Sequence, residues 1–71
     1  MPTTDVSTDT LAILRVLGDL QARHTVPTVQ AAAIGAGLSY MDAYDLVNRA
    51  FTDGLISQNL QLTDAGRKAI A

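Results

Sequence analysis

The pattern of apolar and polar positions is most regular between residues 37 and 56. Within this stretch, apolar residues recur at spacings of three and four, which places them on one face of a helix: Ala43, Leu46, Val47 and Ala50. Ser39 precedes them as a suitable N-cap, because its hydroxyl can accept from the first free backbone N–H groups. Gly54 stands where helices commonly end in a left-handed residue. We therefore predict a turn, a helix over residues 39–53 and then an extended segment.

A wider apolar face precedes this stretch and predicts a first helix that fades near residues 23 and 24. Its apolar positions are Leu11, Ile13, Leu14, Val16, Leu17 and Leu20. Three residues could each cap its start, and the sequence leaves the choice open: Ser7, Thr8 and Asp9. Asp19 and Arg23 form an i,i+4 pair in the favourable acid-first order. Pro27 then disfavours helical geometry in the residue before it, which separates this helix from the next one.

Two shorter helices are predicted from their caps. Thr28 can cap a second helix running to about Ala36, in which small side chains would let another helix approach closely. Thr63 can cap a last helix over residues 64–71, with Asp64 near its positive end. These assignments leave residues 55–62 as the connection between the third and fourth helices.

That connection has the composition of a small β-hairpin. Two short apolar segments, residues 55–57 and 60–62, flank a polar centre. Asn59 tolerates positive φ, so it suits the turn between two strands. We predict two short antiparallel strands here.

The composition is that of one small domain with closely packed helices. The chain has 71 residues, of which 48% are hydrophobic and only 4% aromatic, and eleven are alanine. We predict a core built from Leu14, Leu17, Ala33, Ala43, Val47 and Ala50. Residues 1–8 are polar and unpatterned and are predicted to be a disordered tail, which leaves residues 9–71 as the domain.

Charge and cysteine content exclude several kinds of partner and cofactor. The formal net charge is −2 and the sequence pI is about 4.8, which is the wrong sign for general polyanion binding. There is no cysteine, so a disulfide framework and a thiolate metal site are excluded. No apolar run approaches the roughly 20 residues needed to span a bilayer, and no secretory signal is recognisable. We expect a cytoplasmic protein without a membrane partner.

Catalytic chemistry has little support in the sequence. His24 is the only histidine and has no neighbouring acid closer in sequence than Asp19, so we interpret it as a solvated residue at a helix end. Asp42 and Asp45 could share one side of a helix, but a paired-carboxylate catalyst needs an enclosed pocket that a small alanine-rich domain hardly provides. We predict no catalytic residue, no metal site and no cofactor.

The order of the predicted elements resembles a known family. It combines Gly37-Leu38-Ser39, the helix that follows, Gly54-Leu55-Ile56 and Leu62-Thr63-Asp64-Ala65-Gly66. This arrangement, together with Ile13 to Leu17 in the first helix, resembles the winged helix-turn-helix domains of small bacterial MarR-like and PadR-like regulators. The resemblance covers about residues 10–70. It implies a mainly α fold with a small β-hairpin as the wing.

The same resemblance implies a function and a site. In such domains the third helix is the recognition helix in the DNA major groove, and the hairpin touches the DNA backbone or minor groove. On this chain the resemblance implies a DNA- or partner-binding surface made of Thr28, Ser39, Tyr40, Met41, Tyr44, Asn48 and Arg49. Thr28 and Ser39, at helix N-termini, would contact phosphates.

The charges of the third helix support a second interpretation. Three carboxylates, on Asp42, Asp45 and Asp53, accompany a single Arg49 and oppose binding to phosphates. Our first hypothesis is a small DNA-binding transcriptional regulator. The alternative is a protein-interaction module that uses the Tyr40–Tyr44 face on another protein and binds DNA weakly or not at all. For Ile34 and Met41, the sequence leaves core and surface positions equally open.

Self-association is a further expectation. The first helix has six large apolar residues between Leu11 and Leu20, more than a small alanine-rich core is expected to cover. We therefore predict a homodimer through the first or the last helix. Leu11 and Val16 are the residues expected on its outward flank.

Overall fold

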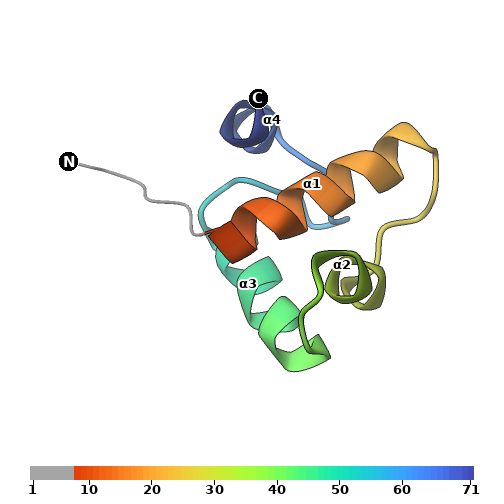
Figure 1. The fold of residues 1–71 in the computed structure, drawn as a ribbon. Coiled ribbons are helices and arrows are strands. Elements are labelled where there is room, and N and C mark those ends of the chain that lie inside the picture. The colour runs from red at the N-terminus through yellow and green to blue at the C-terminus, as the bar shows by residue number, and fades with distance from the viewer. Residues whose placement is uncertain (1–7) are drawn as a thin grey trace.

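The computed structural model describes residues 8–71 and is built from four helices (Figure 1). These are α1 (Thr8–Ala22), α2 (Val29–Ala36), α3 (Tyr40–Thr52) and α4 (Asp64–Ile70). Thr8 is the first residue of α1, whereas Ser7 and most of the predicted tail lie outside the described residues. The predicted positions of all four helices are confirmed to within one or two residues.

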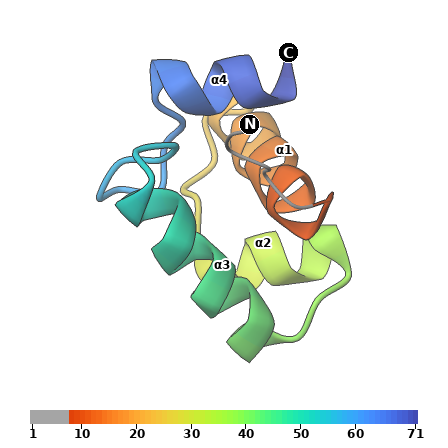
Figure 2. The same ribbon diagram turned by 90° about the vertical axis from the view of Figure 1, so that its left-hand side faces the viewer.

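α1 is the central element of the fold. In two perpendicular views, α4 lies on one side of α1, and α2 and α3 lie on the other (Figures 1 and 2). Ile13, Leu14 and Leu17 of α1 are fully buried. Leu11 and Val16, expected to face outward, are half-buried. Three helices of the same chain thus pack around α1, and the homodimer through the first or last helix stays a prediction.

Side-chain caps determine where three of the helices begin. In each case a hydroxyl accepts from the backbone N–H three residues later, at 3.0 Å for Thr28, 3.2 Å for Ser39 and 3.2 Å for Thr63. Gly37 ends α2 with φ of 72°, the left-handed conformation that a residue without a Cβ adopts most easily. The turn from Gly37 to Ser39 is thus short and fixed at both ends, and it sets the direction of α3.

The core is formed by small side chains of α2 and α3 against branched side chains of α1. All six predicted core residues are buried: Leu14, Leu17, Ala33, Ala43, Val47 and Ala50. The connection after α3 adds Ile56 and Leu62 to this core. Alanine on both facing helices allows α2 and α3 to approach closely, so no aromatic side chain is needed to fill the interior.

The predicted β-hairpin is wrong. Residues 8–71 contain no β-strand and no sheet, and residues 55–62 form a compact turn with one isolated antiparallel bridge between Ile56 and Leu62. The chain is therefore all-helical in its described part. The fold class expected from the resemblance, a mainly α domain with a two-stranded wing, is corrected accordingly.

Hydrogen bonds between residues 57 and 61 form one end of the bridge and close a tight turn directly beyond it. The Ser57 N–H donates to the Gln61 carbonyl at 2.8 Å, and the Leu60 N–H donates back to the Ser57 carbonyl at 3.0 Å. The Ser57 hydroxyl also accepts from two backbone N–H groups inside the turn. The left-handed residue is Leu60, with φ of 62°, and not Asn59 as expected. The backbone and the hydroxyl of Ser57 thus hold residues 57–61 in a closed turn.

Neighbouring backbone groups are occupied by other parts of the chain. The Leu55 N–H donates to the Ala50 carbonyl of α3 at 2.9 Å, and the Leu55 carbonyl accepts from the Thr63 N–H at 3.1 Å. The Leu62 N–H donates to the Gln21 Oε1 of α1 at 3.1 Å. The bond from Thr63 to Leu55 belongs to the bridge itself, and the Leu62 N–H points away from Ile56, so its bond to Gln21 does not compete with the pairing. The pairing stops because the Leu55 N–H bonds to the end of α3 and the Thr63 carbonyl accepts from the Arg67 N–H of α4 at 2.9 Å.

We expect Gln21→Leu to destabilise the protein by about 1–3 kcal/mol, because the partly buried Leu62 N–H would lose its acceptor. Chemical denaturation followed by circular dichroism measures this loss. Gln21→Glu is the matched control, since it retains an acceptor oxygen and should lose less. A leucine variant as stable as the wild type would show that this hydrogen bond does not hold the turn in place.

Candidate interaction surface

The predicted site residues lie on the outer surface of α3 and at two helix N-termini. Ala43, Val47 and Ala50 turn one face of α3 into the core, which leaves the remaining positions exposed. The exposed fraction is 73% for Met41, and Asn48 and Arg49 are exposed as well. Ile34 of α2 is 74% exposed, so both residues that the sequence left open are surface residues.

All three tyrosine and phenylalanine residues of the chain lie on one flank of this helix. Tyr40, Tyr44 and Phe51 are 54%, 48% and 51% exposed, and the chain has no tryptophan. At about 100° per residue, spacings of four and seven place them within a sector of roughly 40°. We call these three residues the aromatic flank. None of them fills the core, although aromatic residues usually supply much of a small domain's buried area.

Part of the aromatic flank is ordered by its own contacts. The rings of Tyr40 and Tyr44 stack with centroids 6.3 Å apart and an angle of 17° between their planes. A stacked pair has already lost part of its rotational freedom, so less entropy remains to be lost when another surface covers it. The sequence predicted this pair, whereas it missed Phe51. The repeat of exposed aromatic positions at 40, 44 and 51 was the available signal.

The opposite flank of α3 is charged. Asp42 and Arg49 lie roughly 160–180° around the helix from the aromatic flank, and Asp45 lies between the two flanks. Arg49 Nε is 3.3 Å from Asp45 Oδ2, in an exposed i,i+4 pair. Such a pair adds little stability, but it places a carboxylate beside the only cation of the helix. Arg23 and Arg67 are also paired, with Asp19 and Asp64.

The two hydroxyls expected to contact phosphates act as helix caps. The oxygens of Thr28 and Ser39 each accept from a backbone N–H, at the N-termini of two different helices. Asp42 provides the N–H for Ser39 and is itself an acid in the first turn of α3. The N-terminus of α3 therefore already has a carboxylate in its first turn.

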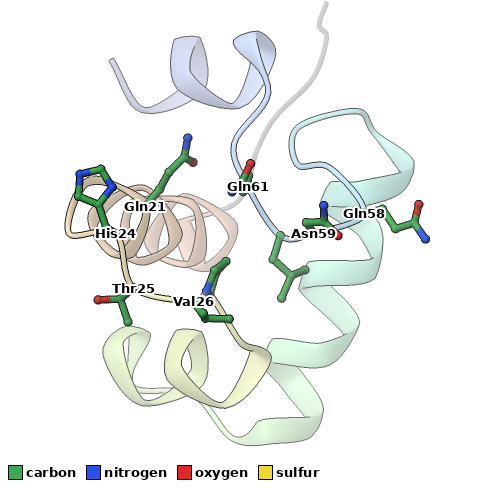
Figure 3. Close-up of a pocket in the computed structure, with 9 residues that line it drawn as sticks. Gln21, His24, Thr25, Val26, Gln58, Asn59 and Gln61 are labelled. Carbon is green, nitrogen blue, oxygen red and sulfur yellow. The ribbon is translucent and has the colours of Figure 1, made fainter.

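A separate hollow of about 900 Å³ lies between the loop that follows α1 and the turn that follows α3 (Figure 3). It is lined by Gln21, His24, Thr25, Val26, Pro27, Gln58, Asn59, Leu60 and Gln61. Besides the His24 imidazole and the Thr25 hydroxyl, these side chains are amides and apolar groups, and none is a carboxylate. The lining of this hollow therefore places amide and apolar side chains around His24.

Residues 8–71 contain no cluster of three or more histidine, aspartate or glutamate side chains that could hold a metal ion. No helix in this part of the chain has the length and apolar character needed to cross a membrane. Comparisons of the chain with protein-family models, with curated proteins and with solved structures gave no match.

Proposed function

We propose that this chain is a protein-interaction module that binds a partner protein through the aromatic flank of α3 and the adjoining Met41. The observation that carries the proposal is the placement of Tyr40, Tyr44 and Phe51. All of the chain's tyrosine and phenylalanine residues are half-exposed on one flank of one helix, while the core is made of alanine, valine, leucine and isoleucine.

The physical argument concerns what this flank gains from being covered. Tyrosine, phenylalanine and methionine are enriched at protein interfaces, and the two aromatic types bury large areas with few rotatable bonds. Half of each aromatic side chain here is still in contact with water. Covering it with another protein releases that water, and the tyrosine hydroxyls can hydrogen-bond at the edge of the interface.

DNA binding through α3 is the second candidate, and a specific feature favours it. α2 and α3 are joined by the short turn from Gly37 to Ser39, as in a helix-turn-helix unit. Against it, α3 and its C-cap carry three carboxylates and one guanidinium, and Asp45 pairs with that guanidinium. Phosphates would meet net negative charge, and no wing adds contacts.

The expected result for DNA is no binding to random duplex at about 0.15 M salt, and at most weak binding at about 0.05 M. Fluorescence anisotropy of a labelled duplex measures both. Arg49→Ala is the informative variant: under DNA binding it would weaken the complex and reduce the salt dependence by about one phosphate contact. Tight binding at physiological salt would reverse the order of the two candidates.

Protein binding is tested with peptide ligands of the wild-type protein, selected from a displayed library of random 16-residue peptides. Tyr40→Ala and Tyr44→Ala should each reduce the affinity for the selected peptides at least about fivefold, because loss of an interface anchor costs more than about 1 kcal/mol. Arg49→Ala is the matched control on the charged flank and should change binding less than about twofold.

The two tyrosines also report binding directly, because they are the only tyrosines and no tryptophan is present. Ligands that bind without changing tyrosine emission, and that bind both alanine variants as tightly as the wild type, would contradict the proposed function. Circular dichroism of each variant establishes that the fold is retained.

A further inference from the structure

We propose that the aromatic flank of α3 seats a single amphipathic helix of the partner protein, with basic side chains on the edge that lies over Asp45. This inference rests on the proposed function and names the chemistry of the partner. It follows from the spacing of the flank, from its lack of free backbone groups and from the charges beside it.

The spacing of the flank is that of a helix–helix seam. Tyr40, Tyr44 and Phe51 follow one another at intervals of four and seven residues, which are spacings between seam positions of a heptad repeat. The seam position between Tyr44 and Phe51 is Val47, which belongs to the core. Val47 is 5% exposed and the three aromatic residues are about half-exposed. The seam therefore runs along the border of the core for about 16 Å, a length that three turns of a partner helix match.

An extended peptide fits this surface less well. Extended peptides gain affinity by hydrogen bonding to an exposed sheet edge, and residues 8–71 contain no strand. The backbone of α3 is hydrogen-bonded within the helix and offers no substitute. A proline ring between Tyr40 and Tyr44 would need about 7–8 Å between ring planes for contact on both sides, whereas the centroids are 6.3 Å apart. A helix that packs on the outer edges of these rings needs neither free backbone groups nor space between the rings.

The residues beside the flank specify the rest of the partner. Met41 and Asn48 lie between the flank and Asp45 around the helix, and both are exposed. Methionine adapts to branched side chains, so apolar residues of the partner can pack there. Beyond them, α3 and its C-cap have a formal charge of −2, from three aspartates and one arginine. Lysine or arginine on that edge of the partner is attracted, and aspartate or glutamate is repelled.

The test uses the peptides selected with the wild-type protein as bait. We expect them to share apolar residues at helical spacing and an excess of lysine and arginine, and to become helical on binding. Replacing a central residue of a selected peptide with proline should weaken its binding at least tenfold. Exchanging its basic residues for glutamate should do the same, and raising the salt concentration should reduce the second effect.

The protein supplies the matched variants. Phe51→Ala should weaken the helical peptides at least fivefold, because it removes one end of the seam. Asp45→Asn should weaken basic peptides and leave the glutamate-exchanged forms unchanged or slightly improved. Asp64→Asn, on α4, is the control for a general change of charge and should have an effect below twofold.

The outcomes separate this inference from the function on which it rests. Selected peptides that depend on both tyrosines, yet tolerate proline or are acidic, would overturn the helical or basic partner and leave the interaction module in place. Selection that yields no ligand dependent on Tyr40 and Tyr44 would overturn both. Helical, basic peptides that lose binding with Phe51→Ala would establish the seam.

Discussion

Val47→Asp should leave the chain unfolded at 25 °C. Val47 is 5% exposed and lies in the core between α3 and α1. A carboxylate there has no positive partner among its buried neighbours and costs several kcal/mol. At about 0.05–0.15 kcal/mol per residue, a chain of 71 residues has a total stability of roughly 4–11 kcal/mol. The penalty is therefore comparable to the whole stability of the fold.

Loss of helical circular dichroism and collapse of proton chemical-shift dispersion would reveal this unfolding. Asn48→Asp is the matched control, because it adds the same charge at the next, exposed position of the same helix. It should change stability by less than about 0.5 kcal/mol. If the Val47→Asp variant melted cooperatively near the wild-type temperature, the packing of α3 described above would be wrong.

The helices could be predicted from the sequence because their ends are encoded locally. Thr28, Ser39 and Thr63 each act on an N–H only three residues away, and Gly37 acts through its own φ. Nothing distant competes with these contacts. The helical spacing of alanine and valine in α3 likewise identified the buried face, since a 13-residue helix presents the same face throughout.

The hairpin was predicted wrongly because the helices on either side use the backbone groups that would extend the pairing. The Leu55 N–H bonds to the Ala50 carbonyl at the end of α3, and the Thr63 carbonyl accepts from the Arg67 N–H at the start of α4. Leu60 adopts positive φ although Asn59 is the better local candidate. Hydrogen bonds to the adjoining helices and around Ser57 therefore decide the conformation of this segment. They override the alternation of apolar residues that predicted strands.

The candidate surface was predicted in part. Tyr40 and Tyr44 were expected outside because each buried hydroxyl would need a partner, and both are about half-exposed. Phe51 has no such group, so its side chain alone gave no reason to predict a surface position. Alanine-rich packing of α2 against α3 leaves no space for it inside. The exposure of Phe51 follows from how three helices pack together, and the spacing of residues within α3 alone could not predict it.

Gly66→Ala should destabilise the protein by about 2–3 kcal/mol, although alanine is the better helix former by about 1 kcal/mol. Gly66 is buried in α4, and a Cβ there would overlap the Leu55 carbonyl oxygen, with its carbonyl carbon at 3.1 Å. This oxygen is backbone and already accepts from the Thr63 N–H, so it cannot rotate away. The methyl group must push α4 away from the turn that precedes it.

Thermal unfolding should show a decrease of roughly 10–20 °C in Tm for this variant. Amide exchange at Thr63 should accelerate, because its hydrogen bond to Leu55 lies at the point of overlap. Ala65→Gly, at the exposed position beside it, is the matched control and should cost about 1 kcal/mol through helix propensity alone. If propensity governed both sites, the two substitutions would have opposite signs. Close approach of α4 to Leu55 requires that both destabilise, with the larger loss at Gly66.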